Sequence, residues 1–131
     1  MTRGRAVSVV VRSAVVALAL LAVSACGGGD TPTLEVMSEE PSTPDYEYVI
    51  PAGTNSRLRS GEVVEIMPAR LEVLVGESIR IRNEDSAGAF VGIFYVGAGE
   101  TVNMRFTTPG ELTGKCEVSS SGEFTIQVEE A

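Results

Sequence analysis

The sequence predicts an all-β fold, a small sandwich of about seven or eight short strands within residues 45–131. Short runs of alternating apolar and polar residues follow one another there, separated by Gly, Pro, Asn and Ser. No run of 10 or more residues after the first 25 has the periodicity of a helix. Alternation with one polar face indicates antiparallel sheets packed on a single core. A domain of this size buries about 60–65% of its unfolded surface, which is enough to fold alone.

The first 25 residues are predicted to be a targeting segment. Arginines precede an unbroken apolar run at 14–23, and small residues lead from there into Cys26 and three glycines. The run is short for a spanning helix, which needs about 20 apolar residues. The pattern resembles the lipobox of bacterial lipoproteins, which implies that Cys26 carries an acyl chain such as palmitate on the extracytoplasmic face of the cell membrane. An ordinary secretory signal peptide cut near Ala25 is the alternative.

Residues 26–44 are expected to be the lipidated cysteine and a flexible, disordered linker. After the glycines, Thr, Ser and Glu are interrupted by three prolines. Such a segment cannot bury enough apolar surface to offset the entropy of ordering it. We therefore expect a tether that joins the membrane to a domain at 45–131.

The charge balance limits the partners. The whole chain has a net charge of −8, and removing residues 1–25 takes away three of the ten basic residues and none of the eighteen acidic ones, which leaves −11. Nucleic acid and anionic lipid both need a basic face, so neither is expected as a direct partner. The acidic surface suits a basic protein or a cation, although solubility alone also explains it.

Individual elements follow from turns and alternation. Strands are expected at 46–50, 62–67, 70–75, 79–82, 102–106, 112–118 and 124–128, with a polar loop at 57–61. Proline ends the first two strands, and Gly76 with Glu77 makes the turn before the fourth. Residues 89–96 are almost wholly apolar, so we expect one strand buried on both faces, with a register that the pattern does not assign.

Part of this pattern resembles cupredoxins, over about residues 60–129. The resemblance rests on the run at 64–85, the Thr-Pro-Gly turn within 106–110, and Cys116 followed by a Ser and Gly loop and a closing strand. It implies a Greek-key β-sandwich. An immunoglobulin-like sandwich is the next alternative.

The resemblance also implies where a copper site would lie. Cupredoxins hold type 1 copper with two histidines, a cysteine thiolate and a weak axial ligand, usually methionine. Matching the motifs places the two histidines at Ala89 and Ser119 and the thiolate at Cys116. The axial methionine falls at or near Gly122, and the chain contains no histidine. We therefore expect the scaffold with three vacant ligand positions and no cofactor.

Cys116 leaves two interpretations open. It is either a small buried hydrophobe or an exposed thiol at the open end of the sandwich. Reactivity needs a lowered pKa, whereas the neighbouring Glu117 would raise it. Sulfur ligands suit Cu(I), so Cys116 with Met104 or Met67 is a candidate copper site, although alternating methionines are more often part of a core.

The sequence offers two further candidate sites. Loop glycines would frame a shallow apolar pocket lined by Phe90 and Phe94, although turn geometry explains the glycines equally well. The pair Glu84 and Asp85 is either a solvated turn or a site for a single cation.

No catalytic constellation appears in the sequence. Histidine is absent as a base, no cysteine cluster has zinc spacing, and no Gly-rich phosphate loop carries a lysine. The first hypothesis is a monomeric, non-enzymatic binding or accessory module that contacts an envelope or membrane protein through the loops at the Cys116 end. The second is copper handling or electron transfer through a nonstandard site centred on Cys116. A purely structural role in the envelope stays open.

Overall fold

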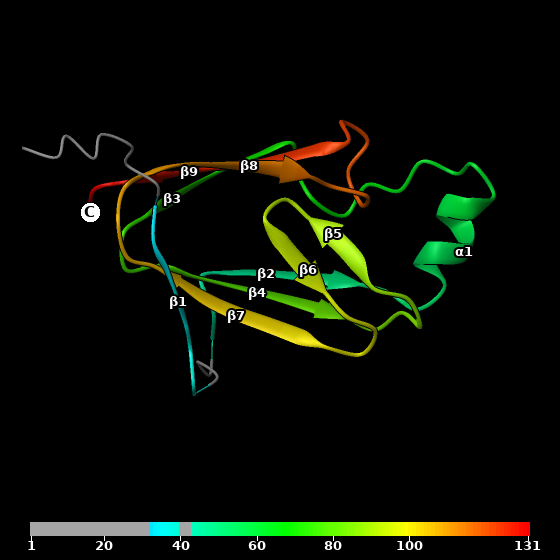
Figure 1. Ribbon diagram of the computed structural model, residues 1–131, viewed down its shortest axis with the longest axis horizontal. Helices are drawn as coiled ribbons and strands as arrows, with labels where there is room; N and C mark the ends of the chain where they lie inside the picture. Colours follow the sequence, from blue (N-terminus) through cyan, green and yellow to red (C-terminus); the bar gives the residue numbers. More distant parts are fainter. Residues whose placement is uncertain (1–31, 40–42) are drawn as a thin grey trace, which may run out of the picture.

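The computed structural model describes residues 32–39 and 43–131, so the predicted signal peptide and Cys26 lie outside the described residues. The elements in chain order are β1 (Leu34–Val36), β2 (Tyr46–Ile50), α1 (Thr54–Arg59), β3 (Arg70–Leu74), β4 (Ser78–Asn83), β5 (Ala89–Val91), β6 (Phe94–Val96), β7 (Thr101–Phe106), β8 (Gly110–Lys115) and β9 (Glu123–Glu129). The predicted all-β sandwich is confirmed (Figure 1).

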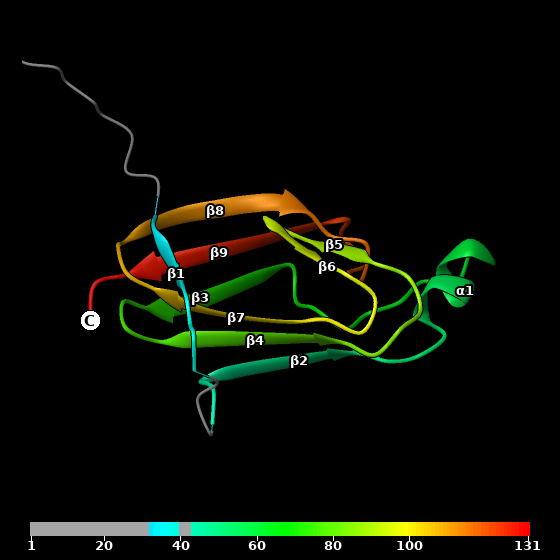
Figure 2. The ribbon, with the colours of Figure 1, turned by 60° about the horizontal axis from the view of Figure 1, so that its bottom comes forward.

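Two sheets face each other across one core, and a third, two-stranded sheet lies between them at one side (Figures 1 and 2). The first sheet has the order β1-β7-β4-β2, the second β3-β9-β8, and the third is the β5–β6 hairpin. The pairs β2–β4 and β3–β9 are parallel, and the other pairs are antiparallel. The expectation of wholly antiparallel sheets is therefore wrong for two pairs. The chain leaves the first sheet after β2, forms β3 in the second sheet and returns as β4, so that β2 and β4 run in the same direction. The alternation of residues within a strand does not reveal such a crossing.

The alternation within strands predicts the core correctly. Ile79 and Ile81 on β4 point inward and are buried, as is Val73 on β3. On the outer side of the first sheet, Arg80 and Arg82 approach the Glu47 carboxylate at 3.7 and 3.6 Å. The inward side chains of both sheets form one hydrophobic cluster.

The predicted flexible linker at 26–44 is wrong for residues 34–36. Leu34 to Val36 form strand β1, which pairs antiparallel with β7, so that Leu34 lies opposite Phe106. The Thr33 carbonyl accepts hydrogen bonds from the Thr107 N–H and hydroxyl at 3.0 and 2.7 Å, and the Thr33 N–H donates to Thr108 Oγ1 at 2.6 Å. These long-range hydrogen bonds order a segment whose composition alone predicts disorder. Residues 33–36 therefore belong to the sandwich, although the sequence predicts a domain that starts at residue 45.

Residues 54–67 also differ from the prediction. The polar loop expected at 57–61 overlaps helix α1, and residues 62–67 do not form a strand. Helix α1 starts after Gly53, where the Asp85 carboxylate accepts the N–H groups of Gly53 and Asn55 at 3.0 and 2.6 Å. Asp85 is 30 residues away from Asn55, so sequence proximity does not show this stabilisation of the helix start.

The apolar run at 89–96 is a tight hairpin instead of one buried strand. Strands β5 and β6 are joined by Gly92 and Ile93, with Gly92 at φ 61° as a two-residue turn requires. Val91, Phe94 and the other inward positions are buried, but Phe90 and Tyr95 point outward and are exposed. The hairpin was missed because its outward residues are apolar too.

Candidate functional site

The positions at which the resemblance places copper ligands do come together in space. The Cys116 N–H donates to the Gly122 carbonyl at 2.9 Å, and the Gly122 N–H donates to the Ser119 carbonyl at 3.1 Å. Ala89 starts β5, whose Val91 forms a β-bridge with Cys116. The loop after β8 and the start of β5 therefore meet at one end of the sandwich.

The side chains at these positions do not fit a type 1 copper site. Ala89 is a buried methyl group, and the buried Ser119 hydroxyl lies 3.0 Å from the Ser121 hydroxyl. Gly122 has no side chain and occupies a left-handed conformation at φ 75°. Imidazole nitrogens set the geometry of such a site, and neither a methyl group nor a hydroxyl replaces them.

Cys116 is a buried thiol, with 2% of its surface exposed. Burial is the largest cause that raises its pKa, and the carboxylates of Glu65 and Glu117 raise it further, while the backbone N–H groups of Val118 and Gly92 oppose the shift. The thiol therefore stays protonated at neutral pH, whereas a reactive cysteine is a thiolate at that pH. Cys116 is therefore buried, as the first interpretation expects, and is not exposed at the open end of the sandwich.

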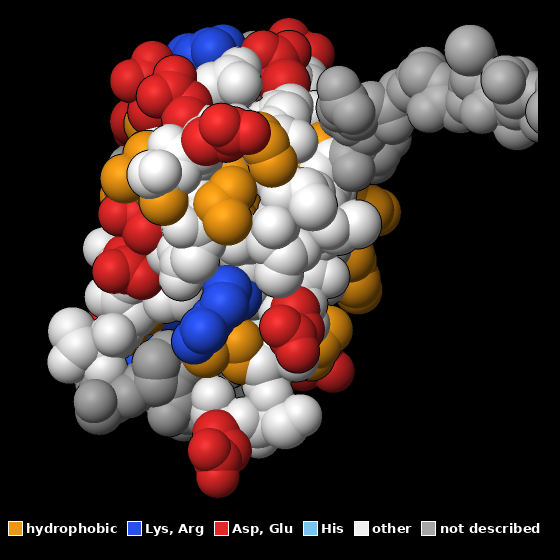
Figure 3. All heavy atoms as spheres, turned by 90° about the vertical axis from the view of Figure 1, so that its left-hand side faces the viewer, with side chains coloured by type: hydrophobic (Ala, Val, Ile, Leu, Met, Phe, Trp, Pro, Cys, Tyr) orange, Lys and Arg blue, Asp and Glu red, His pale blue; other side chains and the backbone are white. Residues whose placement is uncertain are grey.

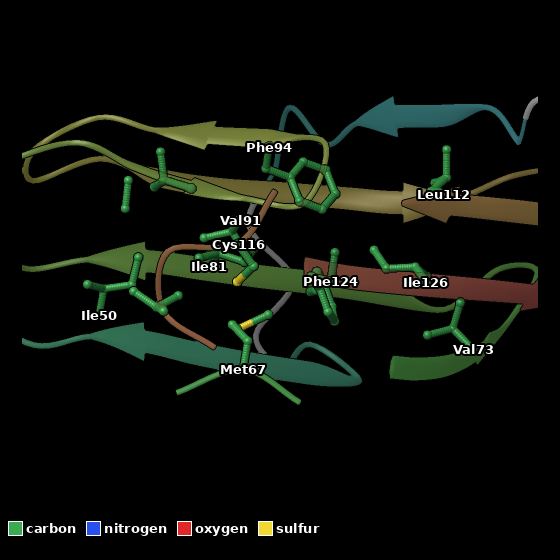
Figure 4. Close-up of a cluster of buried hydrophobic side chains, with 14 of the residues drawn as sticks. Ile50, Met67, Val73, Ile81, Val91, Phe94, Leu112, Cys116, Phe124 and Ile126 are labelled. Carbon is green, nitrogen blue, oxygen red and sulfur yellow. The ribbon is translucent and has the colours of Figure 1, made fainter. Parts of the chain in front are cut away.

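Of the two candidate methionines, Met67 lies against Cys116. Both side chains are buried, and their sulfur atoms point toward one another in the core (Figure 4). The backbone N–H of Met67 donates to the Val118 carbonyl at 3.1 Å, which holds this segment beside the Cys116 loop. Met104 belongs to β7 in the other sheet, in register with Val36. Cys116 and Met67 are thus the sulfur pair that the fold brings together.

The β5–β6 hairpin packs its turn directly on β8. The Gly92 N–H donates to the Lys115 carbonyl at 2.8 Å. A Cβ atom at Gly114 would overlap the backbone of Gly92, so the two backbones are in contact. The absence of a side chain at Gly114 therefore lets the hairpin turn lie directly against β8.

The acidic pair Glu84 and Asp85 is not a wholly solvated turn, because the two carboxylates have different surroundings. Asp85 is buried, and its carboxylate accepts the Ser86 N–H at 2.8 Å in addition to the two N–H groups before and within α1. These hydrogen bonds hold the pKa of Asp85 below its ordinary value, in spite of the opposing effect of burial. The Glu84 side chain instead forms an exposed ion pair with Arg82 at 3.2 Å.

The predicted pocket between Phe90 and Phe94 does not exist in that form, because the two rings lie on opposite faces of the hairpin. A hollow of about 380 Å³ opens instead between the hairpin, β7 and the end of β1. Its lining is mostly apolar: Val36, Met37, Ile93, Phe94, Tyr95, Thr101, Val102, Asn103 and Met104. The sequence could not predict this hollow, because its formation requires both β1 and the hairpin.

Two further findings concern only the described part of the chain. Among residues 32–39 and 43–131, no three or more His, Cys, Asp or Glu side chains are grouped so that they could hold a metal ion. Nor does that part contain a helix long and apolar enough to cross a membrane.

Solved structures of amicyanin resemble this sandwich. A Cu(I) form of one methionine mutant aligns at a TM-score of 0.45 with 16% identity, covering 73% of this chain and 98% of that one. A reduced Cu(I) form of a proline mutant at pH 4 aligns at 0.43 with 16% identity, covering 78% and 95%. These values carry no conclusion about the fold of this chain or about copper in it. No protein-family model and no curated protein matches the sequence.

Proposed function

We propose that this chain is a membrane-anchored, extracytoplasmic binding module, with a cupredoxin-like sandwich, that is not an enzyme and holds no type 1 copper. The supporting observation is the set of side chains at the former ligand positions. Ala89 and Gly122 offer no donor atom, Ser119 offers a hydroxyl already 3.0 Å from Ser121, and Cys116 is buried as a thiol. A sandwich without a reactive group can still present a rigid surface to a partner.

Copper titration of residues 27–131 tests this proposal. The fragment keeps β1, which a fragment starting at residue 45 would lose. We expect no stoichiometric binding of Cu(II) and no strong visible absorption from a copper–thiolate bond. Stoichiometric binding that disappears in Cys116→Ser would contradict the proposal.

A second candidate function is Cu(I) binding, and the facing sulfurs of Cys116 and Met67 favour it (Figure 4). Against it, the ligand must be a thiolate, whereas burial raises the pKa of the Cys116 thiol. Anaerobic titration with Cu(I) separates the two functions. Binding that is lost in Cys116→Ser and Met67→Leu but kept in Met104→Leu would support the copper function. The absence of Cu(I) binding would end it.

The lipid anchor at Cys26 is part of the proposal. Its support is the sequence around Cys26 and the position of Thr33, which is fixed at the turn after β7. Seven residue steps separate Cys26 from Thr33, so the chain cannot span more than about 25 Å between these two residues. Acidic side chains predominate over basic ones on the face of the domain that carries this turn (Figure 3). An acidic face does not adsorb to anionic lipid, so membrane attachment would depend on the acyl chain.

The anchor is tested by substituting Cys26. We expect Cys26→Ser to move the protein from the membrane fraction to the soluble fraction of bacterial cells. Cys116→Ser is the matched control and should stay in the membrane fraction. Retention of Cys26→Ser on the membrane would rule out the lipid anchor.

A further inference from the structure

Exposed hydrophobic side chains are concentrated on one part of the molecule. Among the described residues, six large hydrophobic side chains are exposed: Val36, Val63, Leu74, Phe90, Ile93 and Tyr95. Four of these belong to one surface, which we call the hairpin surface: Val36, Phe90, Ile93 and Tyr95. Val36 is 72% and Tyr95 59% exposed. Single exposed hydrophobics are ordinary, but a contiguous group of them marks an interaction site.

The four side chains are connected through contacts. Val36, Ile93 and Tyr95 line the apolar hollow of about 380 Å³. Phe90 extends this surface, because its ring centroid lies 5.0 Å from that of Tyr95, with the planes tilted by 57°. The Tyr95 ring also lies over Gly88, where any Cβ atom would overlap the Tyr95 hydroxyl. The aromatic pair therefore lies on the outer face of a hairpin whose other face is buried.

A charged hollow adjoins the apolar one. It has a volume of about 500 Å³ and shares Val36 and Met37 with the apolar hollow. Its other lining side chains include two carboxylates, Glu35 and Glu39, and one guanidinium, Arg105. An apolar hollow next to a net negative one is complementary to an apolar group beside a positive one.

We infer that the hairpin surface and the adjoining charged hollow together bind a segment of a partner protein in which an apolar side chain stands beside a lysine or arginine. This inference rests on the proposed binding function and names the partner's chemistry. It also moves the contact surface from the loops at the Cys116 end to the side of the sandwich formed by the hairpin, β7 and β1.

Charge distinguishes this partner from two others. The chain has a net charge of −8, so a second copy of it and an anionic bilayer are both repelled at long range. A basic protein segment is attracted. The volume of the apolar hollow is sufficient for a large apolar side chain, and such buried anchors supply most of the affinity at protein interfaces.

A peptide-binding experiment tests the inference on residues 27–131. The probe is a fluorescein-labelled peptide of alternating leucine and lysine, and binding is measured by fluorescence anisotropy. Two matched peptides replace either all lysines by glutamate or all leucines by serine. We expect the leucine–lysine peptide to bind, at least about tenfold more tightly than either control. Its affinity should fall with added salt.

Variants then locate the site. Tyr95→Ser and Val36→Ser should each weaken binding about tenfold. Gly88→Ala, which displaces the Tyr95 ring, should weaken it too. Val63→Ser removes an equally exposed valine outside the hairpin surface and should leave binding unchanged. The urea midpoint of each variant shows that a loss of binding is not a loss of folding.

Several results would overturn the inference. These are no binding of the leucine–lysine peptide, no preference over the glutamate control, or unchanged binding by Tyr95→Ser. Binding to phosphatidylcholine vesicles that Tyr95→Ser abolishes would assign the surface to lipid. Self-association that the same substitution abolishes would assign it to a second copy. None of these results changes the outcome of the copper titrations, so failure here is separable from failure of the proposed function.

Discussion

Gly114→Ala tests whether the hairpin packs on β8 as closely as the structure shows. Gly114 does not have a positive φ, so alanine is compatible with its backbone conformation. In an unhindered strand, replacing glycine by alanine stabilises the fold by roughly 0.5–1 kcal/mol. Here the new methyl group would overlap the Gly92 backbone, and backbone cannot move aside as easily as a flexible side chain.

The expected loss of stability in Gly114→Ala comes from moving the hairpin turn away from β8. Moving the hairpin away from β8 stretches the 2.8 Å hydrogen bond from the Gly92 N–H to the Lys115 carbonyl, worth about 0.5–1.5 kcal/mol. It also loosens the packing of Val91 against Cys116, and overpacking of this kind typically costs 1–3 kcal/mol. We therefore expect Gly114→Ala to lower the free energy of unfolding by about 2 kcal/mol.

Urea denaturation followed by circular dichroism measures this change. The matched control is Glu111→Ala on the same strand, which removes an exposed ion pair with Arg70 at 3.5 Å. That variant should change the free energy of unfolding by less than about 1 kcal/mol. If Gly114→Ala proved more stable than the wild type, the backbone contact between the hairpin and β8 would be refuted, because the two hypotheses predict opposite signs.

Three other predictions concern the Cys116 thiol, the start of α1 and the attachment of β1. Burial raises the folded-state pKa of Cys116, so the contribution of the thiol to stability is present below the unfolded pKa of about 8.5 and is lost as the pH rises from there through the folded pKa. Urea midpoints between pH 7 and 9.5 should therefore fall less steeply for Cys116→Ala than for the wild type. Equal slopes would refute a raised pKa for Cys116. The pKa of Asp85 is lowered, so its contribution is present above the unfolded pKa of about 3.9 and is lost as the pH falls through it toward the folded pKa. Asp85→Asn should therefore cost about 1–2 kcal/mol at pH 7 and flatten the acid dependence, whereas Glu84→Gln on the exposed neighbour should do neither. Thr107→Val removes the 2.7 Å hydrogen bond to the Thr33 carbonyl, and a loss of about 1 kcal/mol should speed amide exchange in β1 about fivefold. The control Thr113→Val breaks the 2.9 Å hydroxyl contact with Thr125 in the second sheet and should leave amide exchange in β1 unchanged. Equal effects of the two variants would show that Thr107 does not hold β1.

The parts of the fold that were predictable are those in which one face is polar. In β4, arginines alternate with buried isoleucines, and the register of burial follows directly. The hairpin at 89–96 was misread because Phe90 and Tyr95 are apolar and exposed, so the run shows no alternation. An exposed aromatic pair is thus both the cause of the error and the reason to assign the surface a binding function.

Other elements depend on contacts between distant residues. Strand β1 is ordered through Thr33, Thr107 and Thr108, and α1 starts where Asp85 accepts its first N–H groups. The partners that stabilise β1 and the start of α1 lie far away in the sequence, so the composition and propensity of these two segments do not predict their structure. At the end where the resemblance places copper ligands, Cys116, Ser119 and Gly122 do lie together, but only the structure shows that the sulfur of Met67 points toward that of Cys116.

The hydrogen bonds of Thr33 attach it at the end of β8 opposite Cys116. Thr107 and Thr108 precede β8, while Cys116 follows it, so Thr33 and the buried sulfur lie at opposite ends of one strand. Six strand residues correspond to about 20 Å. The proposed lipid anchor at Cys26 would therefore be joined to the domain at the end opposite Cys116. With a reach of up to about 25 Å, the hairpin surface would be open to neighbours embedded in the same bilayer.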